Sequence, residues 1–156
     1  RNRLAGAPVV VGRDAMATER AIRGIVVNNK VSNVRPSSGT GEADALAVVE
    51  ACASAAGADG AFLLPASTGV IGWALPVAEM CAAASTLEER DSAYDLASAM
   101  MTTDRYAKVA RATTASGASV VGVVKGAGMI EPELCATMLC FFLTDALVDD
   151  LQDTLD

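Results

Sequence analysis

The chain has 156 residues, of which 52% are hydrophobic and 20% charged, a composition that suits one soluble globular domain with a substantial core. Its net charge is −7 and its few lysines and arginines are scattered, which argues against nucleic-acid binding. The longest apolar run, around Cys135–Leu143, falls short of the ~18–20 residues that span a bilayer, so no membrane span is expected.

The first part of the chain predicts two strands, a loop and a helix. Val9–Val11 and Gly24–Val27 are short β-branched runs, which favour strands. The stretch Asn28–Gly41 is rich in Asn, Ser, Gly and Pro and predicts a loop. Apolar residues then recur at helical spacing from Glu42 to Ala56. The expected N-cap and the expected stop of this helix are Thr40 and Gly57.

The rest of the chain continues the alternation of strands and helices. Ala61–Leu64 predicts a strand, followed by a turn at Thr68–Gly69. Two helices are expected, at Pro76–Ala84 and Glu88–Met101, and two more strands, at Ser119–Val124 and Met138–Leu143. Because the order is not strictly βαβ, we predict an α/β fold, a layered α-β-β-α sandwich with a mixed sheet, as a single domain over residues 1–156.

Several kinds of chemistry are excluded by the residue inventory. Histidine is absent, so the chain cannot supply a Ser-His-Asp or Cys-His arrangement of its own. "GAGMIE" at Gly126–Glu131 lacks the third glycine of the dinucleotide fingerprint, and no phosphate-loop motif occurs. The cysteines form no C-x-x-C pair, so we expect no metal and interpret them as small buried hydrophobes in a reducing environment. They are Cys52, Cys81, Cys135 and Cys140.

A different kind of nucleophile remains possible at Thr137, which follows the small residue Ala136. A hydroxyl can react without histidine when cleavage of the preceding peptide bond frees its own α-amino group as the general base. An α-amino group titrates near ~8, close enough to neutrality for this role. On the dipeptide alone, a packed strand threonine is the more common interpretation, so both stay open here.

Four stretches in order carry a family resemblance. They are "PASTGVIG", "MTTDRYAK", "KGAGMIEP" and "ATMLCFFLTDA", at Pro65–Gly72, Met101–Lys108, Lys125–Pro132 and Ala136–Ala146. In this order and spacing they resemble the ornithine acetyltransferase family, the bifunctional glutamate N-acetyltransferases of arginine biosynthesis. The stretch "VNNKVSN" at Val27–Asn33 looks like a variant of the family's Asn-rich loop.

The resemblance implies a reaction. Members of the family cut themselves at an Ala-Thr bond, which here matches Ala136 and Thr137, and the new N-terminal threonine becomes the nucleophile. This nucleophile takes the acetyl group from N-acetylornithine as an ester and passes it to glutamate. Acetyl-CoA is a donor in some members, so it is expected as a possible substrate, and no cofactor is expected.

The resemblance also implies the site residues. Thr68 and Gly69 match the family's oxyanion pair, which supplies a hydroxyl and a backbone N–H to the developing negative charge. Lys125 matches the lysine on the carboxylate side of the substrate. Thr102 or Thr103 matches a substrate-contacting hydroxyl, and Thr102 is preferred because of its distance from Lys125.

Three further positions are expected to support the site. Asp104 is interpreted either as a residue that orients the "MTTD" segment or as an ordinary turn carboxylate. Gly126 and Gly128 are expected to let backbone approach the site closely.

Two features depart from the family pattern. Five residues, Glu131–Cys135, stand before the Ala-Thr pair where the family usually has four, directly next to the bond that would be cut. The chain also runs only nineteen residues beyond Thr137. We therefore expect a partial domain of the family that lacks most of the β-chain portion.

Two alternatives to an active enzyme follow from these departures. One is a catalytically inactive, uncleaved relative that serves as a structural subunit of a larger assembly, and a weaker one is a binding module for an acetylated amino acid. Either way the expected partners are a β-chain portion or other protein subunits, together with small amino-acid substrates. The expected location is the cytoplasm, or the mitochondrial or plastid matrix in a eukaryote.

Overall fold

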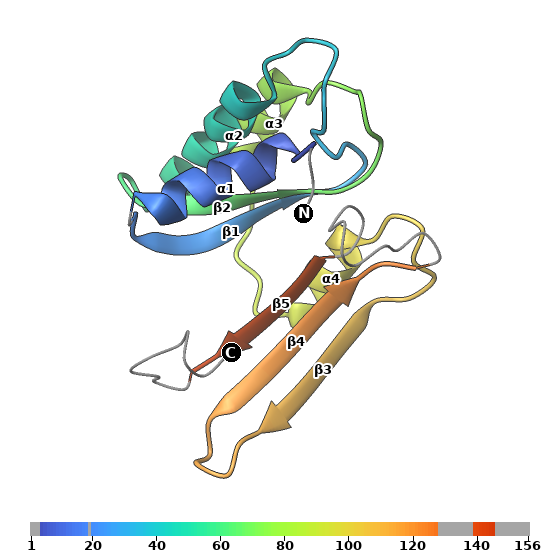
Figure 1. The fold of residues 1–156 in the computed structure, drawn as a ribbon. Helices are drawn as coiled ribbons and strands as arrows, with labels where there is room; N and C mark the ends of the chain where they lie inside the picture. Colours follow the sequence, from blue (N-terminus) through green and yellow to red (C-terminus); the bar gives the residue numbers. More distant parts are fainter. Residues whose placement is uncertain (1–3, 19, 128–138, 146–156) are drawn as a thin grey trace.

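The structure is a computed structural model that describes residues 4–18, 20–127 and 139–145. It contains four helices and five strands within these residues (Figure 1). The helices are α1 (Ala7–Ala17), α2 (Gly41–Ala55), α3 (Val77–Ala84) and α4 (Ala93–Met100). The strands are β1 (Ile22–Asn28), β2 (Phe62–Ser67), β3 (Lys108–Thr113), β4 (Ser119–Lys125) and β5 (Leu139–Thr144).

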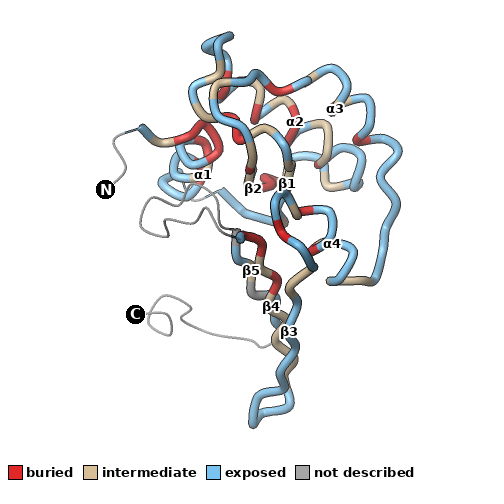
Figure 2. The backbone as a smooth tube through the Cα atoms, turned by 90° about the vertical axis from the view of Figure 1, so that its right-hand side faces the viewer, coloured by how far each residue is buried: buried red, intermediate tan, exposed pale blue. Residues whose placement is uncertain are grey.

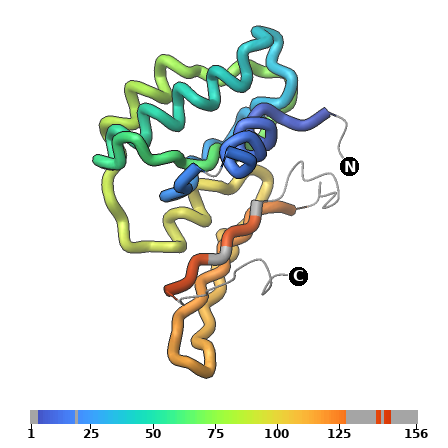
Figure 3. The backbone as a smooth tube through the Cα atoms, turned by 60° about the vertical axis from the view of Figure 1, so that its left-hand side comes forward, coloured from blue at the N-terminus to red at the C-terminus, as the bar shows by residue number. Residues whose placement is uncertain are grey.

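A βαβ unit forms the first half of the fold. Strands β1 and β2 pair in parallel, and α2 lies in the crossover between them, as parallel neighbours require. The helices α1, α2 and α3 all lie on one side of this sheet (Figure 1), and α3 runs beside α2 (Figure 3). Alanine and valine from α1 and α2 pack on Phe62 and Leu63 of β2, so small side chains bring helices and sheet close together.

An antiparallel sheet forms the second half. Strands β3, β4 and β5 pair in the order β3-β4-β5, and α4 packs against β3 and β4. A second core cluster joins Ala97 and Met100 of α4 to Val123 of β4, and Val27 of β1 packs against the same cluster. The tip of the β3–β4 hairpin is exposed along residues 111–117 (Figure 2). The two sheets thus meet through α4 and β1.

The α/β layered class is confirmed by these elements. Parallel and antiparallel pairings both occur, but in the described residues each kind occupies a sheet of its own rather than alternating within one sheet. The expected strands near Gly24–Val27, Ala61–Leu64 and Ser119–Val124 are present as β1, β2 and β4. No helix in the described ranges combines the length and the apolarity needed to cross a membrane.

The strand predicted at Val9–Val11 is wrong, because these residues lie inside α1. Ala7, Val11 and Ala15 recur every fourth residue and are all buried, whereas Val9 and Val10 are exposed. Pro8 stands at the start of the helix, where the missing N–H costs nothing. The β-branched run suggested a strand, but the spacing of the buried residues fits a helix that packs on β2.

Two further differences concern the middle of the chain. The helix expected over Glu88–Met101 begins only at Ala93, where Ser92 caps it by accepting the Asp95 N–H at 3.2 Å. The strand β3 had no counterpart in the prediction, because Lys108–Thr113 is a mostly exposed edge strand with little apolar pattern.

The expectation of buried cysteines holds only in part. Cys52 and Cys81 are half-buried between α2 and α3, but Cys140 on β5 is exposed, which corrects its interpretation as a core residue. All three are free thiols, and Cys135 lies outside the described residues.

The α2 helix does follow Thr40, but the Thr40 hydroxyl contacts Asp44 Oδ2 at 3.0 Å rather than a backbone N–H.

Candidate active site

A cavity of about 460 Å³ lies where the turn after β2, the segment after α4 and the end of β4 meet. Five of its lining residues are the described site residues that the family resemblance implied. These are Thr68, Gly69, Thr102, Thr103 and Lys125. The remaining wall consists of Lys30, Val70, Trp73, Met101 and Ala127.

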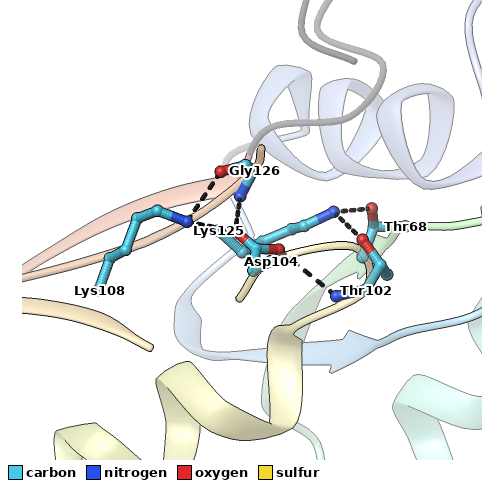
Figure 4. Close-up of polar contacts among 6 residues, drawn as sticks. All are labelled: Thr68, Thr102, Asp104, Lys108, Lys125 and Gly126. Carbon is cyan, nitrogen blue, oxygen red and sulfur yellow. Dashed lines mark hydrogen bonds and ion pairs between the residues drawn. The ribbon is translucent and has the colours of Figure 1, made fainter. Parts of the chain in front are cut away.

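The Lys125 ammonium contacts both Thr68 and Thr102 (Figure 4), and all three residues line the cavity. Lys125 is only 3% exposed, and its Nζ donates to Thr68 Oγ1 and to Thr102 Oγ1, each at 2.9 Å. Because each threonine oxygen accepts from the ammonium, each hydroxyl hydrogen is left to donate elsewhere. The network therefore presents polarised O–H donors beside a buried cation.

Burial lowers the pKa of Lys125, because removal from water disfavours the ammonium. The Asp104 carboxylate raises this pKa, and the Lys108 ammonium lowers it further. The two neighbouring charges therefore shift the pKa of Lys125 in opposite directions.

The Thr68–Gly69 turn is held close to the backbone of Lys30. The Thr68 N–H donates to Asn28 O at 3.0 Å, and the Val70 N–H donates to Lys30 O at 2.8 Å. Gly69 has φ +138°, and a Cβ at this position would lie 2.2 Å from the Lys30 carbonyl carbon, so only glycine fits. The Gly69 N–H donates to no atom within the described ranges and lies in the cavity wall beside the Thr68 hydroxyl.

The Asn-rich segment after β1 positions the second threonine. Asn29 Nδ2 donates to Ala99 O at 2.7 Å and to Met101 O at 3.1 Å, which satisfies carbonyls at the C-terminal end of α4. Asn28 Oδ1 accepts from the Ser67 hydroxyl at 2.6 Å. The loop thereby connects the end of β2 to the residue that precedes Thr102.

Asp104 lies behind the cavity and is buried. Its Oδ1 accepts the Gly126 N–H at 2.8 Å and also contacts Lys108 Nζ, while its Oδ2 accepts the Thr102 N–H at 3.4 Å. Burial alone would raise the pKa of this carboxyl, but the hydrogen bonds from Lys108, Gly126 and Thr102 outweigh it and lower the pKa to about 2. Of the two interpretations of Asp104, the structure supports the one in which it orients the segment.

Sequence reasoning did not single out Lys108. Its Nζ donates to Gly126 O at 2.9 Å and contacts Asp104, four residues earlier in the chain. The signals in the sequence were its place at the end of "MTTDRYAK" and this opposite charge at a spacing of four, which occurs in many segments without function.

The remaining predicted residues divide into two groups. Thr102 makes the hydrogen bond to Lys125, whereas Thr103 lines the cavity without a side-chain partner in the described ranges. Ala136, Thr137 and Gly128 lie outside the described residues. Among the residues that are described, no group of acidic or sulfur ligands suits a metal ion.

Comparison with known proteins gives the same family throughout. The chain matches the ArgJ family over residues 1–155. It is 38% identical over 151 residues to the arginine biosynthesis bifunctional protein ArgJ of Deinococcus radiodurans, covering 96% of this chain and 38% of that protein. It is 43% identical over 155 residues to the glutamate N-acetyltransferase Oat2 of Streptomyces clavuligerus, covering 97% of this chain and 38% of that protein.

Two crystal structures share the fold. Arginine biosynthesis bifunctional protein ArgJ of Bacillus halodurans superposes with a TM-score of 0.73 at 26% identity, covering 88% of this chain and 73% of that one. The ornithine acetyltransferase of Mycobacterium tuberculosis, complexed with ornithine, superposes with a TM-score of 0.75 at 28% identity. The match covers 89% of this chain and 74% of that one.

The chain spans about 38% of the length of these curated relatives. Its match to the family nevertheless runs from one end of the chain to the other. The chain therefore belongs to the ArgJ family, the bifunctional enzymes of arginine biosynthesis.

Proposed function

We propose that this chain supplies the acetyl-transfer site of an enzyme that moves an acetyl group from N-acetylornithine to glutamate. The observation that carries the proposal is the cavity in which Lys125, Thr68 and Thr102 form one hydrogen-bonded network beside the Gly69 N–H. This arrangement offers a hydroxyl and an amide to an oxyanion and a cation to a carboxylate, which acyl transfer between amino acids requires.

The first step is hydrolysis of the bond between Ala136 and Thr137, in which one water is consumed, a carboxylate is left on Ala136 and the α-amino group of Thr137 is freed. This amino group titrates near ~8 and takes the proton of the Thr137 hydroxyl as that oxygen attacks the acetyl carbonyl. The tetrahedral oxyanion accepts hydrogen bonds from Thr68 and Gly69. Its collapse breaks the C–N bond, and the ammonium returns the proton to the departing ornithine amine.

The second half of the reaction repeats these steps in reverse. The amine of glutamate attacks the acetyl ester, the same oxyanion forms, and the C–O bond to Thr137 breaks as its oxygen regains a proton. The product is N-acetylglutamate, and acetyl-CoA can enter as an alternative donor of the acetyl group. Lys125 holds a substrate carboxylate, and Val70, Trp73 and Met101 provide an apolar wall for the acetyl methyl group.

Replacement of the nucleophile tests the proposal. In the native protein we expect Thr137→Ala to leave the bond to Ala136 intact in an intact-mass measurement and to lower acetyl transfer by ~10³-fold or more. Thr137→Ser should retain cleavage and part of the transfer rate, since it keeps the hydroxyl. Thr86→Ala is the matched control, because Thr86 is exposed and its hydroxyl donates, among the described residues, to Ala83 O alone.

The outcomes separate the candidate roles. Transfer that persists in Thr137→Ala would overturn the assignment of the nucleophile. A wild-type protein that stays uncleaved and transfers no acetyl group would instead support the alternative of a structural subunit.

A further inference from the structure

The backbone of Gly126 is held at both of its polar atoms by a single ion pair. The Gly126 N–H donates to Asp104 Oδ1 at 2.8 Å, and the Gly126 carbonyl accepts from Lys108 Nζ at 2.9 Å. Asp104 and Lys108 contact each other, so the four groups close a ring (Figure 4). The Asp104 side chain is 1% exposed and that of Lys108 31%, so the carboxylate is shielded from water and the cation is not.

This ring lies one residue beyond Lys125. Gly126 has φ +143°, so the chain turns there in a conformation that glycine adopts readily. The other oxygen of Asp104 accepts the Thr102 N–H at 3.4 Å. One carboxylate therefore fixes the backbone next to Lys125 and the backbone of Thr102, whose hydroxyl accepts from Lys125.

The pairing of the sheet does not require this ion pair. Strands β3 and β4 are already joined in a six-residue register from Lys108↔Val124 to Thr113↔Ser119. A buried carboxylate is costly to remove from water unless it is fully hydrogen-bonded, and here its bonds go to the backbone behind the cavity. The arrangement therefore serves the geometry of the cavity wall rather than strand pairing.

We propose that Asp104 and Lys108 are positioning residues that clamp Gly126 and thereby aim the Lys125 ammonium at the hydroxyls of Thr68 and Thr102. The inference rests on the proposed function, since it concerns the same cavity. Neither residue lines the cavity. Both act through Lys125 and the backbone, and this distinguishes them from residues that contact substrate.

The first test measures acetyl transfer in variants of the native protein. Asp104→Asn keeps the shape of the side chain but removes its charge, and Lys108→Met removes the bond to Gly126 O. Because a displacement of about 1 Å costs ~10²-fold in rate, we expect each variant to lower kcat by ~10-fold to ~100-fold. KM should also rise, since Lys125 holds a substrate carboxylate in the ground state, but by a smaller factor than kcat falls, because the Thr68 hydroxyl contacts the oxyanion only in the transition state. Lys108→Arg keeps a cation and should restore most of the rate.

A matched control comes from the exposed ion pair between Glu88 and Arg90, whose side chains are 74% and 64% exposed. Like Asp104→Asn, Glu88→Gln replaces a carboxylate with an amide and so removes one negative charge. Glu88 is not among the residues that line the cavity. It should leave kcat and KM at their wild-type values.

The second test follows the titration of Lys125 by NMR on the ¹³Cε carbon and needs no activity. Within the described ranges, the charged groups near this ammonium are Asp104 and Lys108 behind the cavity and Lys30 in its wall. Loss of the Asp104 charge should lower the pKa of Lys125, and loss of the Lys108 charge should raise it. A merely structural role would loosen the site and admit water in both variants, which would raise the pKa in both.

The proposal is overturned if both variants only lower thermal stability while kcat stays unchanged and the titration of Lys125 does not move in opposite directions. If the wild-type protein transfers no acetyl group, the proposed function fails, and the clamp stands only when Lys125 shows the opposite shifts and the backbone NMR resonances of Lys125 and Gly126 move in both variants but not in Glu88→Gln.

Discussion

Gly69 shows how one residue type limits what this site can be. Its φ is +138°, and a Cβ at this position would lie 2.2 Å from the Lys30 backbone, which leaves no space for any side chain. The close approach allows the Thr68 hydroxyl and the Gly69 N–H to share one turn in the cavity wall. Glycine at position 69 is therefore needed both for the close approach to the Lys30 backbone and for the proposed oxyanion contact.

Gly69→Ala should therefore damage both folding and activity. We expect a loss of at least about 2 kcal/mol in the free energy of unfolding, because the clash is with backbone that cannot rotate away, together with a strong loss of acetyl transfer. Chemical denaturation and the transfer assay measure the two effects. Gly72→Ala is the control: Gly72 also has positive φ, at +90°, but open space surrounds its Cβ position. Equal effects in the two variants would refute the role of the clash.

Asp104 should make the protein more stable above pH 4 than below it. Its pKa falls from an ordinary 3.8 to about 2 in the folded state, so the folded form favours the ionised carboxylate. This stabilisation is fully present above the unfolded pKa and is lost as the pH falls from about 4 through about 2. By linkage it amounts to about 2 kcal/mol.

Urea unfolding as a function of pH measures this contribution. Asp104→Asn should be less stable than wild type at pH 6, and the difference should shrink as the pH approaches 2. Glu88→Gln, in an exposed pair, should show no such convergence. A difference between Asp104→Asn and wild type that is constant with pH would contradict the assigned pKa.

At the scale of elements, α1 shows where local sequence misleads. The run Val9–Val11 has the β-branched composition of a strand, and a strand would place Val9 and Val11 on the same face. In the helix, Val11 is 6% exposed and packs in the core with Ala15, while Val9 is 41% exposed. The helix thus separates two valines that a strand would bury together.

Alanine substitutions at these two valines measure that difference. Val11→Ala should lower the free energy of unfolding by about 1–3 kcal/mol through lost burial and an unfilled space, whereas Val9→Ala should be near neutral, since alanine is also the better helix former. Thermal or urea unfolding of the two variants gives the comparison. Equal losses at both positions would favour a strand.

At the scale of the whole molecule, the cavity depends on elements far apart in the sequence. Lys125 and Thr68 are 57 residues apart, yet their hydrogen bond is buried. The parallel register places Asn28 opposite Ser67, so the loop after β1 and the turn after β2 leave the sheet at the same edge. Asn29 then reaches across to the end of α4 and brings the segment of Thr102 into the same wall.

The sequence by itself determined the family and part of the fold. The four ordered motifs indicated the family and, among the described residues, five that line one cavity. The helix α2 was predictable because its apolar spacing and its flanking Thr40 and Gly57 are local features. Such signals are carried by neighbouring residues, so they can be interpreted without knowledge of the rest of the chain.

Only the tertiary structure decided which face of each segment is buried and which groups meet. It made Val9–Val11 helical, brought Thr68 and Thr102 to the same ammonium, and placed Lys108 against the Gly126 carbonyl. The physical reason is the same in each case. Burial, hydrogen-bond partners and the resulting pKa shifts depend on residues that are distant in sequence and become neighbours only when the sheets and helices pack together.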